Sequence, residues 1–210
     1  MAQPRTQLSH HEYIIILDPS GDGQKTTGRA IDNSFERALT LQCAEKIKLL
    51  LESYNPKLTI IISRSPGDHV YELQNATLAN RLDVNLFLNL NFYPTTDTKP
   101  TLFLYQFSYG NDFIQVQPGL QFSPYDQTYK INKSTTDKLI ESFKTHLTQQ
   151  QYHSLFFVAG PHALPIKPLI GIVSPAIAIE IGLKNKDAWQ QLVEPLALGI
   201  IEMINYLNIT

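Results

Sequence analysis

One carboxylate stands inside an apolar segment of the sequence, where a charge is costly unless it has a partner. Glu180 interrupts the aliphatic run 177–181, which is typical of a buried strand. A carboxylate in such a place could act as an acid or base in catalysis. It could equally lie at a strand end, in contact with solvent or with an arginine such as Arg64. The residue types alone leave both interpretations open.

Polar side chains also gather at the end of another apolar segment. Asn89, Asn91 and Tyr93 lie at the end of a strand predicted for residues 84–90. They could line a polar groove that binds a ligand. They could also hydrogen-bond to the backbone of neighbouring loops.

Two further acidic residues have ordinary structural explanations. Glu36 lies at the start of a predicted helix, where the helix dipole favours a carboxylate and Ser34 could serve as the cap. Asp22 lies in a loop rich in Gly and Thr and is typical of a turn. Cys43, the only cysteine, lies on the apolar stripe of the same helix, so we expect it in the core.

The segments that must position these residues alternate between strands and helices. Short runs of β-branched and aliphatic residues predict buried strands at 13–17, 58–62 and 84–90. Apolar residues at helical spacing predict helices at 34–54 and 70–82. This order indicates one α/β domain over residues 13–210, with a twisted, mostly parallel sheet flanked by helices.

The second half of the chain is less regular. It predicts strands at 101–107, 155–159 and 176–181, and helices at 132–151 and 186–207, the latter restarting near Pro195. We expect a variable, aromatic-rich insert at about 94–152. Its aromatic side chains could bind a sugar, a peptide or a partner protein, or pack on one another; they are Tyr105, Phe107, Tyr109, Phe113, Phe122, Tyr125 and Tyr129.

The overall composition excludes several classes of protein. The 210 residues suffice for one core, and a net charge of −2 without a long basic run argues against nucleic-acid binding. No apolar run is long enough to span a bilayer. Residues 1–12 form a polar segment without the apolar stretch of a signal peptide, so the protein is either cytosolic or an exported form whose signal has been removed.

Three segments resemble the zinc-dependent N-acetylmuramoyl-L-alanine amidases of bacterial cell-wall turnover. Residues 14–23, Ile-Ile-Ile-Leu-Asp-Pro-Ser-Gly-Asp-Gly, resemble the opening strand and metal loop of that family. Residues 63–64, 78–80 and 85–91 resemble its Thr-Arg, its Ala-Asn helix end and its strand ending in Ser-Ile-His-Ala-Asn. Residues 175–182 with Asn185 resemble its Pro-x-x-Leu-x-Glu-x-Gly-Phe-x-x-Asn. The resemblance covers roughly residues 13–93 and 160–207.

The resemblance implies a site that keeps its carboxylates and lacks its imidazoles. In the family, zinc is held by His, Glu and His, and a further Glu serves as general acid/base. These positions fall on Gly21, Glu36, Asn91 and Glu180 of this sequence. The resemblance therefore implies a pseudoenzyme with no metal expected, in which Glu180 is a vestigial acid/base.

The chemistry of zinc explains why the two missing histidines matter. A catalytic zinc needs about three protein ligands and lowers the pKa of its bound water to roughly 7. An oxygen-only set of Glu36, Asn91 and Asp22 suits magnesium, calcium or manganese better. If zinc is bound after all, His69 or His162 is the candidate to complete a rebuilt site.

Three functions follow as hypotheses. The first is a non-catalytic amidase-like domain that binds peptidoglycan fragments or a protein partner, with candidate ligand-binding residues Asp22, Glu36, Arg64, Asn89, Asn91 and Tyr93. The second is an active metal-dependent hydrolase with a substituted metal site, and the third a structural or assembly module. The resemblance also favours a periplasmic or exported protein.

Overall fold

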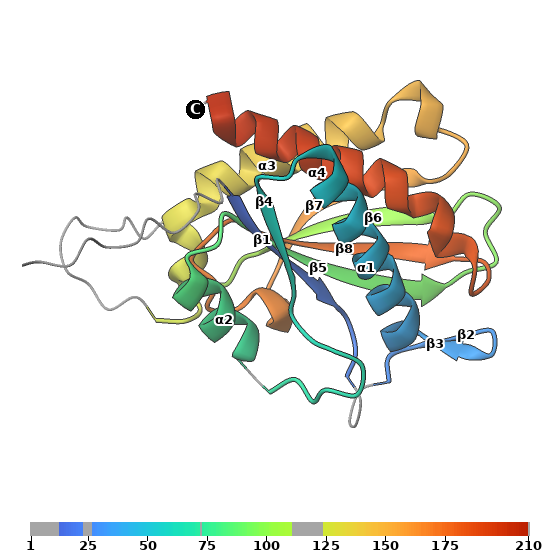
Figure 1. Ribbon diagram of the computed structural model, residues 1–210, viewed down its shortest axis with the longest axis horizontal. Helices are drawn as coiled ribbons and strands as arrows, with labels where there is room; N and C mark the ends of the chain where they lie inside the picture. Colours follow the sequence, from blue (N-terminus) through green and yellow to red (C-terminus); the bar gives the residue numbers. More distant parts are fainter. Residues whose placement is uncertain (1–12, 23–26, 72, 111–123, 210) are drawn as a thin grey trace, which may run out of the picture.

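Six strands form the main sheet of the protein, in the order β4-β1-β5-β8-β6-β7. The computed structural model describes residues 13–22, 27–71, 73–110 and 124–209. The strands of this sheet are β1 (Tyr13–Pro19), β4 (Leu58–Ile62), β5 (Leu86–Pro94), β6 (Thr101–Phe107), β7 (Phe157–Leu164) and β8 (Ala176–Leu183). Figure 1 shows the sheet between helices that lie on both of its faces. The polar segment 1–12 lies outside the described residues.

Four α-helices and short helical turns connect the strands. The helices are α1 (Glu36–Tyr54), α2 (Gln74–Leu82), α3 (Lys133–Leu147) and α4 (Val193–Ile209). A small hairpin of β2 (Ala30–Ile31) and β3 (Ser34–Phe35) precedes α1. The 3-10 turns are η1 (Thr128–Asn132), η2 (Gln150–Tyr152), η3 (Lys167–Leu169) and η4 (Ala188–Leu192).

The pairing of the strands brings the carboxyl ends of β1, β4, β5 and β8 to one edge of the sheet. β1 is parallel to β4 and β5, β5 is parallel to β8, and β6 is parallel to β7. β6 pairs with β8 in antiparallel fashion, so β6 and β7 run opposite to the other four strands. The loops that follow β1, β5 and β8 therefore leave the same edge, which is where parallel α/β sheets place their binding sites. The predicted single α/β domain with a mostly parallel sheet is confirmed.

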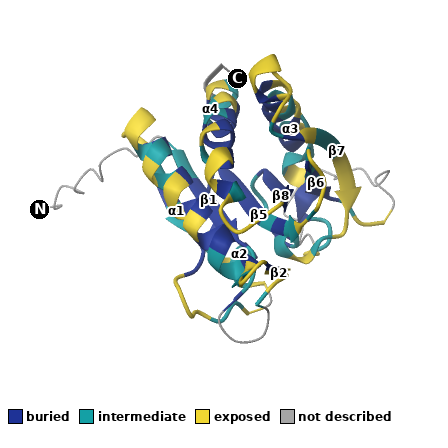
Figure 2. Cartoon of the chain, turned by 90° about the vertical axis from the view of Figure 1, so that its right-hand side faces the viewer, coloured by how far each residue is buried: buried dark blue, intermediate teal, exposed yellow. Residues whose placement is uncertain are grey.

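The two faces of the sheet are covered unequally. One face packs on α1, α3 and α4 and forms the larger core, in which Phe92, Phe143 and Ile15 are fully buried. The other face packs on α2 and η3 in a smaller core around Phe87 and Ile172. Figure 2 shows buried residues on the central strands and exposed residues along β7, the outer strand. The second face is thus the less covered one.

Several boundaries differ from the sequence prediction, and the backbone explains two of them. α2 begins at Gln74 rather than at residue 70, because Leu73 takes a left-handed conformation with φ 61° that no helix accommodates. β7 begins at Phe157 rather than at residue 155, and it includes His162, which therefore lies in a strand. The restart near Pro195 is confirmed, since α4 begins at Val193.

The aromatic-rich segment contributes to the sheet and its cores. It contains β6 and α3, and Phe107 packs against Tyr129 with ring centroids 5.3 Å apart. Both side chains are buried, while Tyr109 and Tyr125 are exposed. Phe113 and Phe122 lie outside the described residues.

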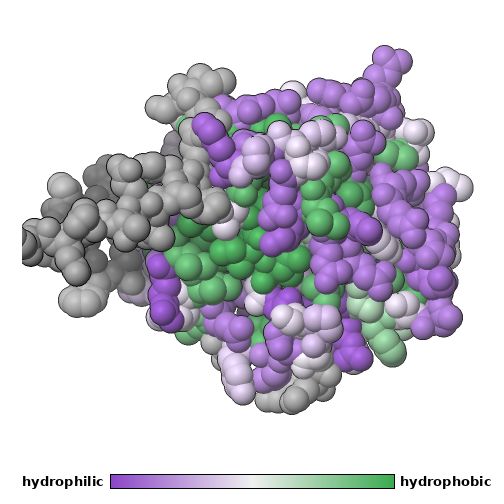
Figure 3. All heavy atoms as spheres, viewed as in Figure 1, coloured by the Kyte–Doolittle hydropathy of each residue, from purple (hydrophilic) through white to green (hydrophobic). Residues whose placement is uncertain are grey.

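Figure 3 shows hydrophobic side chains gathered over β4, the outer strand at the other edge of the sheet. β4 is paired on one side only, and Lys48 Nζ donates to the carbonyl of Ile60 at 2.7 Å.

Among the described residues, no helix has both the length and the apolar character needed to cross a membrane.

Candidate functional site

Glu36 is held by backbone groups from two directions. Its Oε1 accepts a hydrogen bond from the N–H of Phe92 at 2.9 Å, and its Oε2 accepts one from the N–H of Arg29 at 3.0 Å. The N–H of Glu36 in turn donates to the carbonyl of Arg29 at 2.8 Å. The carboxylate is buried, so these two bonds replace the water that it loses.

The loop before Arg29 reaches Glu36 only because it contains a glycine. Gly28 has φ +74°, and a Cβ added there would lie 2.6 Å from the Cβ of Glu36 and 2.8 Å from its Oε2. A side chain at this position would both clash and strain the backbone. Gly28 thereby lets the chain pass directly over Glu36, and Arg29 then lies beside the ends of β5 and β8.

Glu180 forms an ion pair with Arg29. Arg29 Nη1 lies 2.6 Å from Glu180 Oε1 and also donates to the carbonyl of Phe92 at 3.1 Å. Glu180 Oε2 accepts a hydrogen bond from the hydroxyl of Tyr105 at 3.0 Å. Burial raises the pKa of Tyr105 to about 12, and the hydrogen bond to Glu180 and its charge act in the same direction. The phenol therefore remains a proton donor at neutral pH.

The asparagines at the end of β5 are arranged around Asp18. Asn91 donates to Asn89 Oδ1 at 2.6 Å and to the carbonyl of Ile179 at 3.2 Å, and Asn89 donates to Asp18 Oδ2 at 2.7 Å. Ser63 and Asn75 also donate to this carboxylate. Burial raises the pKa of Asp18, while these hydrogen bonds lower it. The network fixes the polar ends of β1 and β5 against each other.

Two arginines stabilise the loop that follows β1. Arg64 is buried, and its guanidinium donates to the carbonyls of Pro19, Ser20 and Arg37 at 2.7–3.0 Å. Arg37 Nη1 donates to the carbonyl of Asp22 at 3.2 Å. Arg64 is thus bound to backbone oxygens of the loop.

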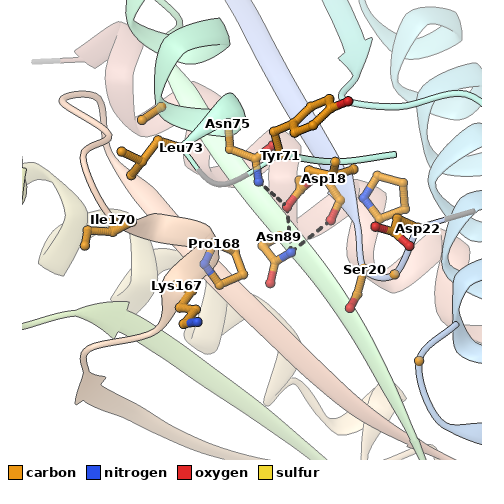
Figure 4. A pocket seen from close by; sticks show the side chains of 15 residues that line it. Asp18, Ser20, Asp22, Tyr71, Leu73, Asn75, Asn89, Lys167, Pro168 and Ile170 are labelled. Carbon is orange, nitrogen blue, oxygen red and sulfur yellow. Dashed lines mark hydrogen bonds between the residues drawn. The ribbon is translucent and has the colours of Figure 1, made fainter. Parts of the chain in front are cut away.

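A cleft of about 450 Å³ opens beside this network. Figure 4 shows Tyr71, Leu73 and Asn75 on the α2 side, Lys167, Pro168 and Ile170 on the η3 side, and Asn89 between them. Its walls are partly apolar, its floor carries the Asp18 network, and Lys167 is exposed with no ion pair among the described residues. Such a cleft suits a small ligand with polar groups and an anionic end.

Solved structures with a similar fold are N-acetylmuramoyl-L-alanine amidases. The catalytic domain of CwlV from Bacillus (Paenibacillus) polymyxa var. colistinus is 18% identical, with a TM-score of 0.59 over 94% of this chain and 99% of that one. Ami1 from Mycobacterium smegmatis is 13% identical, with a TM-score of 0.67 over 92% and 97%. CwlD from Clostridioides difficile, solved in complex with the GerS lipoprotein, is 15% identical, with a TM-score of 0.64 over 92% and 99%.

This chain has the fold of these amidases. No protein-family model and no curated protein sequence matches it. At identities of 13–18%, the likeness to the solved amidases establishes the fold alone, so the activity has to be argued from the residues of the site.

The amidase fold brings most of the predicted site residues to one edge of the sheet. The register pairs Asn91 with Glu180 across β5 and β8, and Glu36 contacts the backbone of Phe92 on the same strand. Asp22 lies beside His69, with Oδ2 3.0 Å from Nδ1. Among the described residues, no group of three or more His, Cys, Asp or Glu side chains lies close enough to hold a metal ion.

Two further predicted candidates contact residues of β6. The His162 ring on β7 lies beside the Tyr105 ring in a tilted arrangement, with ring centroids 5.7 Å apart. Tyr93 donates its hydroxyl to the carbonyl of Thr101 at 3.0 Å.

Arg29 is a candidate site residue that the sequence analysis missed, and Tyr105 was named there only as one of seven aromatic side chains. One of the two interpretations of Glu180 placed it in contact with an arginine such as Arg64, whereas the structure places Arg29 there. The available signal was Gly28-Arg29, a cation directly after a glycine in the loop that leads to Glu36.

Proposed function

We propose that this protein is a non-catalytic amidase-like domain that binds a peptidoglycan-related ligand outside the cytoplasm. The observation that carries the proposal is the ion pair between Arg29 and Glu180, 2.6 Å long, at the position that the resemblance assigns to the catalytic acid/base. Both oxygens of Glu180 are engaged, one by Arg29 and the other by the hydroxyl of Tyr105. In this arrangement Glu180 is an ion-pair and hydrogen-bond partner of Arg29 and Tyr105 instead of a base that faces a water molecule.

The remaining donors do not fit a zinc ion. Gly21 has no side chain, and both carboxylate oxygens of Glu36 already accept backbone N–H groups. The amide of Asn91 donates to Asn89 and Ile179, and a neutral amide is a weak ligand for zinc. A guanidinium beside the carboxylates supplies the positive charge that a metal would otherwise bring.

The ligand is inferred from the cleft and from the amidase fold. Fragments of peptidoglycan combine a sugar with a short peptide that carries carboxylates. The cleft has apolar walls, a floor of amide groups and an exposed cation at Lys167, which suits the peptide part of such a fragment. The amidases of this fold are named for cutting the bond between these two parts. The proposal therefore also places the protein in a compartment that contains peptidoglycan.

Binding and turnover of a purified muropeptide test the proposal together. We expect calorimetry to detect binding, while chromatography detects no released peptide with or without added zinc. The Lys167→Ala variant should weaken binding, and Lys46→Ala, which removes an exposed lysine from α1, should leave it unchanged. Zinc-dependent release of the peptide that a chelator abolishes would contradict the proposal.

A hydrolase with a rebuilt metal site is a second candidate, and one contact favours it. His69 Nδ1 and Asp22 Oδ2 lie 3.0 Å apart beside the cleft, and both residue types bind zinc. This candidate predicts roughly one zinc per chain by elemental mass spectrometry, and its loss in His69→Ala. Protein purified without a histidine tag or chelator that contains no zinc, even after zinc is added back, would exclude it.

A further inference from the structure

Five aromatic side chains share one face of the outer half of the sheet. The register pairs Glu180 with Phe103 and Tyr105 with His162, and paired residues of neighbouring strands point to the same face. Thr101 lies on the same face of β6 and pairs with Phe157, which adds Phe157 to the set. Gly182 lies on the same face of β8 as Glu180 and pairs with Tyr93, which adds Tyr93. We call this set the aromatic floor; it consists of Tyr93, Phe103, Tyr105, Phe157 and His162.

Four rings of the aromatic floor lie next to one another, and Phe157 belongs to the same face through its pairing with Thr101. Ring centroids lie 6.2 Å apart for Tyr93 and Phe103, 6.1 Å for Phe103 and Tyr105, and 5.7 Å for Tyr105 and His162. Phe157 is 58% exposed and His162 is exposed, while the other three are half-buried. The helices α1, α3 and α4 pack on the opposite face, where the main core lies.

Gly182 makes room for neighbouring side chains where the aromatic floor crosses β8. A Cβ added to Gly182 would lie 3.0 Å from the ring of Tyr93 and 2.9 Å from the Cβ of Pro100. The absent side chain leaves room for the ring of Tyr93 over the strand, next to Thr95 and Pro100. The surface over β8 at this point is therefore formed by side chains that reach across it from both sides.

Hydrogen-bonding groups of both kinds border the floor. Glu180 is paired with Phe103 and accepts the hydroxyl of Tyr105, and it is 19% exposed at its side chain. Arg29, 48% exposed, makes its contacts within the described residues through Nη1, so its Nη2 and Nε hydrogens face no described partner. Lys99 Nζ lies 3.6 Å from the ring centre of Phe157. The border thus offers donors and acceptors beside apolar rings.

We propose that the aromatic floor binds the pyranose rings of a glycan strand. A pyranose presents a face of C–H groups, which packs on an aromatic ring, and an equatorial rim of hydroxyls and amides, which needs both donors and acceptors. An apolar peptide would cover the Nη2 and Nε groups of Arg29 without giving them an acceptor, and a nucleic-acid strand would meet no basic groove on a chain of net charge −2. This inference rests on the proposed function and assigns the sugar part of the ligand to the floor.

A titration with tetra-N-acetylchitotetraose, a glycan that carries no peptide, tests the floor. We expect chemical-shift changes on addition of the tetramer to the full chain, confined to β5, β6, β7 and β8. Phe157→Ala removes an exposed ring without disturbing either core and should weaken binding about tenfold, which corresponds to about 1.4 kcal/mol. Phe103→Ala should weaken it at least as much. Tyr54→Ala removes a ring that is 49% exposed at the end of α1 and should have no effect.

The outcomes separate this inference from the proposed function. If a muropeptide binds but the tetramer does not, and Phe157→Ala leaves muropeptide binding unchanged, the floor is overturned while the proposed function stands. If the tetramer binds and both floor variants lose it, the inference is supported. If neither ligand binds, both are overturned. Melting temperatures of the variants that match the wild type show that lost binding is local.

Discussion

At the scale of single residues, Glu36 illustrates how a carboxylate can be fixed by backbone alone. Two N–H groups, from Phe92 and Arg29, point at its two oxygens, and the position lies at the first residue of α1. The sequence offered a helix-dipole explanation and a metal-ligand explanation for this residue. The structure adds a third role, in which Glu36 joins the loop before it to the strand β5.

That role predicts a large effect for a small change. Glu36→Gln replaces an acceptor oxygen by an NH2 group that must face a backbone N–H in a buried place. We expect the free energy of unfolding to fall by about 1–3 kcal/mol, because one N–H is left without an acceptor. Glu45→Gln, an exposed position on the same helix, should change it by no more than about 0.5 kcal/mol. Equal stabilities in urea denaturation would show that the two backbone bonds contribute little.

The hydroxyl of Tyr105 should report on Glu180 through its titration. Its pKa is raised to about 12 in the folded protein, from an unfolded value near 10. A group whose pKa is raised on folding contributes stability that is present below about pH 10 and is lost as the pH rises towards 12. Burial also raises the pKa of Tyr93, so tyrosinate absorbance should show one fewer late-titrating phenol in Tyr105→Phe than in the wild type. The variant should also lose less stability than the wild type over that interval; equal losses would count against the bond to Glu180.

At the scale of secondary-structure elements, the prediction from sequence succeeded where patterns are local. The strands 58–62 and 101–107 match β4 and β6, because runs of β-branched and aromatic residues between turn residues specify a strand with little outside help. The start of α2 was missed because it depends on the left-handed backbone of Leu73. The partner of Glu180 was missed because a loop and a strand far apart in sequence meet only in the fold.

The packing of α3 on α4 depends on a single glycine. A Cβ at Gly199 would lie 2.5 Å from Cε2 and 2.6 Å from Cδ2 of Phe143, whose ring is fully buried. Gly199→Ala should therefore lower the free energy of unfolding by about 1–3 kcal/mol, although alanine is the better helix former. Asn205→Ala, on the exposed side of α4, should change it by less than about 0.5 kcal/mol. If the Gly199→Ala variant were more stable than the wild type, the two helices would have to move apart at little cost.

At the scale of the whole molecule, the two faces of the sheet are covered unequally and contribute differently to stability and to the candidate sites. The face under α1, α3 and α4 holds the main core and supplies most of the stability. The other face is covered by α2 and η3 at one end and carries the cleft, the ion pair and the aromatic floor. Polar and aromatic side chains can remain accessible there because the fold does not rely on burying them.

This division predicts a gradient of hydrogen exchange across the sheet. β1, β5 and β8 are paired on both sides and buried, so their amides should exchange most slowly and report global unfolding. β7 is paired on one side only and is largely exposed, so its amides should exchange fastest among the strands. A glycan bound to the aromatic floor contacts β7 directly, so the tetramer should slow exchange in β7 more than in β4, the opposite outer strand. Equal protection of β7 and β5 without ligand would contradict the gradient, and slowing in β4 alone would place the ligand elsewhere.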